Sequence, residues 1–301
     1  IKTERLLQGL CFGEGPRWHD GALWLSDMHA YEVLRVSADG HAERVVSVDM
    51  QPSGLGWLPS ADGRAAAGDL LIVSMLDRKV LRYDGRSLTQ HADLGALARF
   101  HCNDMVVDAT GRAWVGNFGF DLHAGARPHP TELIVVEPDG SARVAASDLM
   151  FPNGTVITPD GSTLIVGESM ARRLTAFDIG QDGTLTNRRV WAELPDRALP
   201  DGICLDSAGG IWSASPSTGE CLRQVEGGRV THRVTLDQGA YACMLGGADG
   251  RTLFILTAGD SGEGLRAAAA RCAMADALGF EQHDPIAAFG QMQRRRTPGD
   301  P

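Results

Sequence analysis

Six segments of similar layout recur along this chain at intervals of roughly 40 to 50 residues. Each opens with a small or polar residue, continues through a short apolar run, passes a turn and ends in a second apolar run. The segments open at Glu14, Ser53, Asn103, Asn153, Asp201 and Ala242. A period of this length is typical of propellers and solenoids, in which each repeat is one supersecondary unit. The repeat therefore restricts the possible folds more than any other feature.

The apolar runs within each period resemble β-strands. They are short, rich in Val, Ile, Leu and Trp, and separated by Asp-Gly pairs at Asp39-Gly40, Asp84-Gly85, Asp139-Gly140, Asp160-Gly161 and Asp182-Gly183. Asp-Gly supplies the positive φ of tight hairpin turns. No sustained helical periodicity and no alternation of strands with helices precedes about residue 264. We therefore predict an all-β, six-bladed β-propeller with four strands in each blade.

The repeats predict one propeller domain over residues 1–264, because no Ser- or Pro-rich linker divides them. Residues 265–301 form an atypical tail, in which 265–271 is predicted to be helical and 291–301 a loose, basic end. This reading leaves the last blade without its third strand. The segment Glu4-Arg5-Leu6-Leu7 is expected to pair with that blade and close the ring.

The composition argues against several classes of partner. A formal net charge of −10 disfavours non-specific binding to nucleic acid or to an anionic membrane. No apolar run reaches the roughly 18 residues of a spanning helix. The six cysteines show no Cys-x-x-Cys spacing, so we expect buried free thiols and a cytoplasmic location. The oligomeric state stays open between a monomer and a small homo-oligomer.

Four of the repeat openings carry oxygen donors: Glu14, Asn103, Asn153 and Asp201. The first strand of each propeller blade lies nearest the axis, so these side chains should converge at one end of the channel. Two carboxylates that meet there would repel each other unless a cation joined them. The oxygen donors favour a hard cation such as Ca²⁺, Mg²⁺ or Mn²⁺ over a structural zinc, although carboxylates bind Zn²⁺ too; we expect Ca²⁺, with Mg²⁺, Mn²⁺ and Zn²⁺ as alternatives. We therefore predict one divalent metal site in the central channel.

The alternative reading is that these residues form ordinary turns, as Asp-Gly and Asn-Gly pairs often do. The segments Pro152-Asn153-Gly154 and Pro200-Asp201-Gly202 argue against it, because each precedes an apolar strand with no matching strand just before it. The proline restricts the approach of the backbone, and we expect the glycine to let a ligand come close.

The chain resembles the regucalcin (senescence marker protein 30)/gluconolactonase/luciferin-regenerating-enzyme family over about residues 4 to 259. The resemblance is carried by Gly13-Glu14-Gly15-Pro16, Asn103-Asp104, Phe151-Pro152-Asn153-Gly154, Leu199-Pro200-Asp201-Gly202-Ile203 and Leu245-Gly246-Gly247-Ala248-Asp249. It implies a six-bladed propeller with one divalent metal in the channel and an activity that hydrolyses lactones. It also implies that Glu14, Asn153 and Asp201 are metal ligands and that Asn103 is a ligand or a substrate contact.

Further substrate contacts are predicted at His101, Asn117 and Phe118. His101 stands two residues before Asn103, where the animal regucalcins resemble one another in having an arginine that meets the sugar. This departure leaves open whether the lactone is derived from a sugar. Asn117 and Phe118 follow the apolar run Ala113-Trp114-Val115 and could form a wall of the pocket, with a structural role at the blade edge as the alternative.

The predicted reaction is attack of water on a small-molecule lactone, with the cation polarising the carbonyl group. Asp201 is the predicted catalytic base, although a water held by the cation could lose its proton directly. No Gly-x-Ser-x-Gly motif and no glycine-rich phosphate loop is present, so covalent acyl transfer is not expected. Two alternatives stay open: a non-catalytic calcium-binding or scaffold propeller, and a phosphotriesterase-like hydrolase on the same metal site.

Overall fold

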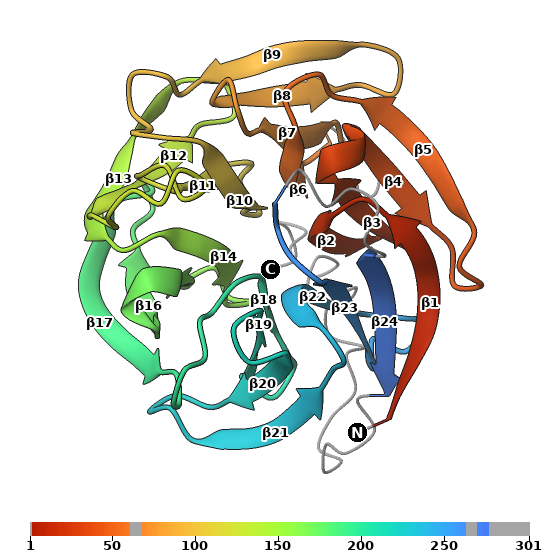
Figure 1. The fold of residues 1–301 in the computed structure, drawn as a ribbon. Coiled ribbons are helices and arrows are strands. Elements are labelled where there is room, and N and C mark those ends of the chain that lie inside the picture. The colour runs from red at the N-terminus through yellow and green to blue at the C-terminus, as the bar shows by residue number, and fades with distance from the viewer. Residues whose placement is uncertain (1, 61–67, 263–269, 277–301) are drawn as a thin grey trace, which may run out of the picture.

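A computed structural model describes residues 2–60, 68–262 and 270–276 of the chain. These residues form β-strands and two short 3-10 turns, η1 (Met28–Ala30) and η2 (Ser169–Ala171). The strands build four-stranded antiparallel sheets arranged as a ring of blades, so the predicted all-β propeller fold is confirmed (Figure 1). Within these ranges no helix is long and apolar enough to span a membrane.

Five blades each consist of four consecutive strands. The first two contain β2 (Gly13–His19), β3 (Ala22–Asp27), β4 (Glu32–Val36) and β5 (Ala42–Ser47), then β6 (Pro52–Trp57), β7 (Leu70–Ser74), β8 (Lys79–Tyr83) and β9 (Leu88–Asp93). The next two contain β10 (Cys102–Val107), β11 (Ala113–Asn117), β12 (Thr131–Val136) and β13 (Ala142–Leu149), then β14 (Pro152–Ile157), β15 (Thr163–Glu168), β16 (Arg173–Ile179) and β17 (Leu185–Glu193). The fifth contains β18 (Ile203–Leu205), β19 (Ile211–Ser215), β20 (Glu220–Gln224) and β21 (Val230–Thr235).

The predicted count of six blades needs a correction, because only five blades are continuous in sequence. The remaining four-stranded sheet is composite, with the strand order β1-β24-β23-β22. It joins β1 (Thr3–Leu10) to β22 (Gly239–Gly246), β23 (Thr252–Ala258) and β24 (Ala270–Asp276). The two ends of the described chain therefore meet in one sheet, which closes the ring.

The expectation that the last blade lacks its third strand is wrong. Residues 270–276 form β24, which pairs antiparallel with both β1 and β23. The alanine-rich composition of this stretch favours a helix. The open edges of β1 and β23 instead offer backbone partners on both sides, and this tertiary environment determines the conformation. The rest of the predicted helix, 265–269, and the end at 291–301 lie outside the described residues.

The turns between strands follow from their sequences. Asp139 accepts a hydrogen bond from the backbone N–H of Ser141 at 2.9 Å, and Gly140 between them has φ 87°. Asp160 accepts from Ser162 N–H at 3.1 Å in the same way. Such turns satisfy the hydrogen-bonding groups of the turn backbone with a neighbouring side chain and allow the short hairpins that a blade requires.

The apolar core lies between neighbouring blades. One cluster combines Leu71 and Val73 of β7 with Met105 of β10 and Val115 of β11, so it joins two blades face to face. Cys102, Cys204, Cys221 and Cys243 are buried free thiols, as the sequence predicted for these four cysteines.

The first strands of successive blades touch one another around the axis (Figure 1). Gly154 N–H donates to the carbonyl oxygen of Asp201 at 3.1 Å, and Gly202 N–H donates to that of Tyr241 at 2.8 Å. A Cβ atom on Gly154 would lie 2.5 Å from the Asp201 oxygen. These glycines therefore make room for the next blade rather than for a ligand, which corrects the reason that the sequence suggested for them.

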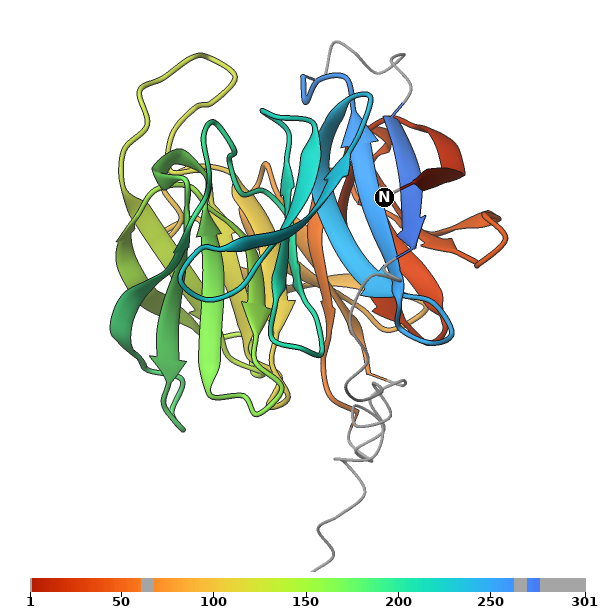
Figure 2. The same ribbon diagram turned by 90° about the horizontal axis from the view of Figure 1, so that it is seen from below.

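Figure 2 shows the ring from the side. The connection between β11 and β12, residues 118–130, extends beyond the same rim of the ring as the end of β23. Residues from both segments, Phe118, Leu122, His123, Ser261 and Gly262, line one cavity. This rim is therefore the side from which a small molecule would reach the channel.

Candidate metal and substrate site

One cavity of about 760 Å³ brings together the four predicted oxygen-donor residues. Glu14, Asn103 and Asn153 lie in the first strands β2, β10 and β14, and Asp201 directly precedes β18. The first three are buried, with 7%, 5% and 4% of their surface exposed, while Asp201 is partly buried. Residues far apart in sequence thus converge because each opens a blade.

A β-bulge turns these side chains toward the axis. The pairing of the first two strands shifts register between Glu14 and Arg17, between Cys102 and Met105, and between Pro152 and Thr155. An extra residue at this point bends a strand and re-aims the side chains next to it. The same shift occurs in β6 between Pro52 and Leu55, so the bulge recurs at equivalent positions in at least four blades.

The carboxyl groups of Glu14 and Asp201 are close enough to disturb each other's ionisation. Burial raises the pKa of Glu14 well above its usual range, and the negative charges of Asp201 and Asp104 raise it further. Burial also raises the pKa of Asp201 to about 8, although a hydrogen bond with Asn153 opposes the rise. Both acids therefore favour the protonated form until a positive charge joins them.

The third acid nearby, Asp104, is already compensated. Its Oδ1 lies 2.8 Å from Nη2 of Arg17 and also accepts a hydrogen bond from the backbone N–H of Met105. Arg17 additionally donates to the carbonyl oxygen of Met105 and to that of Pro16. Asp104 does not line the cavity, but its negative charge still raises the pKa values of Glu14 and Asp201.

The two amides differ in how they are held. Asn153 Nδ2 donates to Ser169 Oγ at 3.2 Å, and Ser169 in turn donates to the carbonyl oxygen of Pro200 at 2.6 Å. Because Asn153 also hydrogen-bonds Asp201, its amide nitrogen is committed and its oxygen is the atom left for a cation. Asn103 Nδ2 is buried and has no hydrogen-bond partner within the described part of the chain. A buried N–H donor without a partner at a cavity points to a hydrogen-bond acceptor that binds there, such as an oxygen atom of a substrate.

The predicted metal site in the channel also needs a correction. Within residues 2–60, 68–262 and 270–276, no group of three or more His, Cys, Asp or Glu side chains is placed to hold a metal ion. The physical reason is that only Glu14 and Asp201 bring carboxylates to the cavity, while Asp104 is paired with Arg17. Any cation here would depend on amide oxygens for its other protein ligands.

A second tier of the cavity wall comes from the residues two positions before five of the six openings. These residues are Phe12, Gln51, His101, Phe151 and Leu199, and all five line the cavity. None of the five lies within a strand, and Gln51 and Phe151 have a positive φ of 60°, so the segment before the first strand, rather than strand alternation, brings them to the cavity. Of these five residues, only His101 was predicted from the sequence to contact the substrate.

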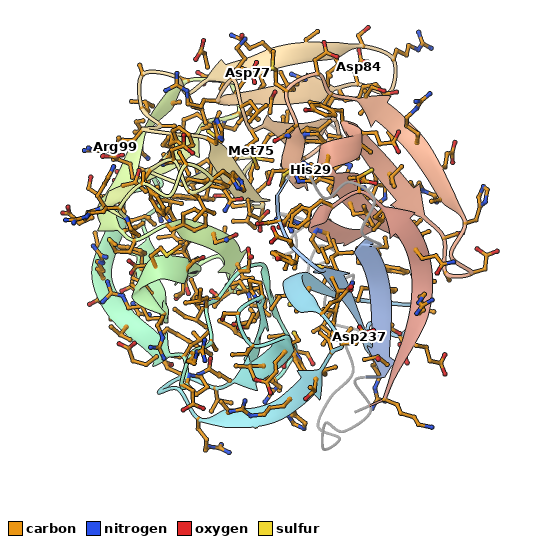
Figure 3. All side chains as sticks on the ribbon, viewed as in Figure 1. His29, Met75, Asp77, Asp84, Arg99 and Asp237 are labelled. Carbon is orange, nitrogen blue, oxygen red and sulfur yellow. The ribbon has the colours of Figure 1, made fainter. Side chains whose placement is uncertain are left out.

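A third tier follows the second strand of each blade. Met28, Met75 and Phe118 donate their backbone N–H groups to the carbonyl oxygens of Phe12, Gln51 and His101, at 2.8, 2.9 and 2.9 Å. All three side chains line the cavity. Figure 3 shows Met75 and His29 toward the centre of the ring and Asp84 and Arg99 at its periphery. The same backbone hydrogen bond thus holds a second-tier residue next to a third-tier residue in three blades.

The three predicted substrate contacts have different positions. His101 and Phe118 line the cavity. His101 stacks on Phe100 with ring centroids 4.1 Å apart, and burial lowers its pKa although Asp121 opposes the shift. Asn117 is fully buried outside the lining: its Nδ2 donates to the Glu132 carbonyl oxygen at 2.7 Å, and its Oδ1 accepts from Thr131. Asn117 therefore ties β11 to β12 and is left out of the proposed site.

Several lining residues were not predicted from the sequence. Tyr241 is one of them: its ring meets Phe12 edge to face at 4.8 Å, and burial raises its pKa to about 12 with help from Asp201. His29 is another, with Nε2 at 3.1 Å from the Ser261 carbonyl oxygen and Nδ1 at 3.4 Å from Gln51 Nε2. No local motif marks these residues, because the ring closure brings them to the cavity.

Comparison with known families assigns the chain to one group. The family model described as SMP-30/Gluconolactonase/LRE-like region matches residues 12–259. The chain belongs to this family. The match spans every opening residue of the cavity, from Glu14 to Asp201, which agrees with the resemblance seen in the sequence.

Curated relatives of the chain carry different names. A pentonolactonase of Haloferax volcanii is 27% identical over 275 residues, covering 88% of each chain. A regucalcin of Danio rerio is 30% identical over 254 residues, covering 82% of each chain. Among solved structures, a gluconolactonase from Xanthomonas campestris is 26% identical with a TM-score of 0.71, and covers 90% of this chain and 88% of its own.

Proposed function

We propose that this protein is a divalent-metal-dependent hydrolase that opens a small lactone by attack of water. Two of its relatives are named lactonases, and a similar solved structure is named a gluconolactonase. The regucalcin relatives support a divalent metal, since one similar structure is described as a calcium-binding protein. The proposal rests mainly on one observation, the meeting of Glu14 and Asp201 with two amides in a single cavity.

The residues present fit a divalent cation. Glu14 and Asp201 would supply two carboxylates, and Asn153 and Asn103 would supply amide oxygens. Hard cations such as Ca²⁺ prefer this type of donor, and Mg²⁺, Mn²⁺ or Zn²⁺ would be the alternatives. The raised pKa values of both acids support the fit, because each describes a buried carboxyl group that lacks a positive partner.

A bound cation would polarise the lactone carbonyl and offset the negative charge that develops on its oxygen. Asp201 would accept the proton of the attacking water with a carboxylate oxygen, as the carbon–oxygen bond to that water forms. The ring carbon–oxygen bond then breaks, and the proton passes to the departing ring oxygen. The product is the open hydroxy acid, so atoms and charges balance without an oxidant or a second substrate.

The surrounding residues would serve this step in two ways. The chain from Asn153 through Ser169 to Pro200 holds the amide in one orientation. His101 and Phe118 would bound the substrate on one side of the cavity. The lowered pKa of His101 keeps its imidazole neutral near pH 7, so it would act as a hydrogen-bonding group rather than as a cation.

The test is acid release from a panel of aldono- and alkyl-lactones by the full chain, before and after chelation. We expect turnover that a chelator abolishes and Ca²⁺ restores. Asp201→Asn and Glu14→Gln should each lower kcat/KM by about 100-fold or more, whereas Glu43→Gln, on the exposed face of β5, should change it less than about twofold. Turnover that survives complete chelation would refute the metal requirement. A bound cation without turnover on any lactone would support the scaffold reading instead.

A further inference from the structure

Most apolar side chains of the two outer tiers belong to one apolar cluster. Phe12, Met28, Met75, Phe118 and Phe151 belong to one buried apolar cluster, with Met170 and Tyr241 packed against it. Each of these side chains also lines the cavity. A surface that is both part of the core and part of a cavity wall offers apolar contact to whatever enters.

The apolar surface has two aromatic sides. On one side the rings of Phe118 and Phe151 lie 4.6 Å apart between centroids, and Phe151 stands two residues before Asn153. On the other side Phe12 contacts Tyr241 at 4.8 Å. Methionines from η1, the end of β7 and η2 stand with them, and their flexible thioethers adapt to the shape of an apolar ligand.

The polar side chains outside the oxygen donors include His29, Gln51, His101, His123, Ser169 and Ser217. Several are already hydrogen-bonded: the Ser169 and Ser217 hydroxyls donate to the carbonyl oxygens of Pro200 and Arg197. His29 and Gln51 hydrogen-bond each other, and His29 also contacts the Ser261 carbonyl oxygen. His101 stacks on Phe100. A substrate with a hydroxyl group on every carbon would lose water at many positions and find a protein partner at only a few, which disfavours binding.

The cavity is also large for a bare lactone ring. Its volume of about 760 Å³ lies in the upper part of the range in which drug-sized ligands bind. A five- or six-membered ring held against Glu14 and Asp201 would leave the apolar tiers in contact with water. A substituent that reaches these tiers would displace that water and contribute to binding.

From these tiers we infer that the substrate is an uncharged lactone with an apolar alkyl or aryl substituent, rather than a polyhydroxylated sugar lactone. The inference rests on the proposed function, since it takes the lactone carbonyl to lie at the oxygen donors. The substituent then lies between Met75 and Phe151, over the second and third tiers. Specificity would arise from the apolar tiers, and chemistry from the inner one.

The experiment measures kcat/KM for γ-lactones whose saturated side chain grows from zero to eight carbons, with glucono-1,5-lactone as the polyhydroxylated probe. Each added methylene should raise kcat/KM by about three- to fourfold until the tiers are filled. Glucono-1,5-lactone should be at least about tenfold poorer than the best alkyl-lactone. A flat or falling dependence on chain length, or a preference for glucono-1,5-lactone, would overturn the inference. Failure to open any lactone would instead refute the proposed function.

A matched pair of variants locates the effect. Met75→Gln places an amide of similar length on the third tier, and it should lower kcat/KM for the long-chain lactones by roughly fivefold while the unsubstituted ring changes less than about twofold. Met50→Gln makes the same change at a residue that is 45% exposed and outside the cavity lining, and should leave the series unchanged. If Met75→Gln does not fold, Phe118→Leu with the same substrates replaces it. An equal loss for short and long chains would contradict the assignment.

Discussion

The raised pKa of Asp201 makes a quantitative prediction about stability in the absence of metal. The native protein retains a proton on Asp201 up to a pH of about 8, whereas the unfolded chain loses it near the ordinary value of 3.8. Between these values the native state binds more protons than the unfolded state. The free energy of unfolding should therefore fall as pH rises, by up to about 1.4 kcal/mol for each pH unit.

Asp201→Asn removes this dependence, because asparagine does not titrate. The difference in unfolding free energy, mutant minus wild type, should rise by about 2 to 3 kcal/mol between pH 5 and pH 7. The raised pKa of Glu14 lowers the free energy of unfolding with rising pH in the same direction, and the lowered pKa values of His19, His91 and His101 act in the opposite direction. All of these groups are present in both proteins. The difference between the two proteins therefore reports the ionisation of Asp201 together with its effect on Glu14.

The assay is urea-induced unfolding of both proteins in a chelator at pH 5, 6 and 7, followed by tryptophan fluorescence. Wild type should lose stability relative to Asp201→Asn over this range. A difference that stays constant, or that shrinks with rising pH, would show that Asp201 is ionised in the metal-free protein. The electrostatic account of the site would then be wrong.

Two further predictions concern the frame around the site. Gly154→Ala should destabilise the protein by about 2 to 3 kcal/mol in thermal or urea unfolding, because its Cβ would lie 2.4 Å from the Ile203 nitrogen. The control Gly259→Ala should change stability little, because its Cβ would meet nothing within 4 Å. Equal effects of the two substitutions would contradict the close approach of the blades. For Glu168, burial alone would raise the pKa, but hydrogen bonds from Arg173, Thr175 and Met150 N–H overcome it and lower the pKa. The ionised Glu168 carboxylate should stabilise the fold above pH 4.5, and this stabilisation should be lost as pH falls below that value. Glu168→Gln should therefore lower the free energy of unfolding by about 3 kcal/mol at pH 7 and by clearly less at pH 3. A cost that does not depend on pH would count against the ion pair.

Much of the fold could be predicted from the repeat alone. The period placed Glu14, Asn103, Asn153 and Asp201 at equivalent points of successive blades, and the structure gathers them on one cavity. The Asp-Gly pairs likewise marked the turns. Such features are local or strictly periodic, so a single sequence carries them.

The parts that could not be predicted depend on tertiary contacts. The stretch 270–276 has a helix-like composition, but two free strand edges make it β24. Asn117 stands at a promising position after a strand, yet Thr131 and Glu132 occupy its amide. Met28 and Tyr241 reach the cavity only because blades close into a ring. No short sequence pattern predicts any of these outcomes.

The most direct test of the central claim is calorimetric titration of Ca²⁺ into the metal-free protein at pH 7, in two buffers that differ in ionisation enthalpy. Two protonated acids that join around a cation must release protons, so we predict one ion bound per chain with release of about one to two protons. Binding should weaken by at least about tenfold in both Glu14→Gln and Asp201→Asn. Absence of binding, or binding that neither variant alters, would contradict the account.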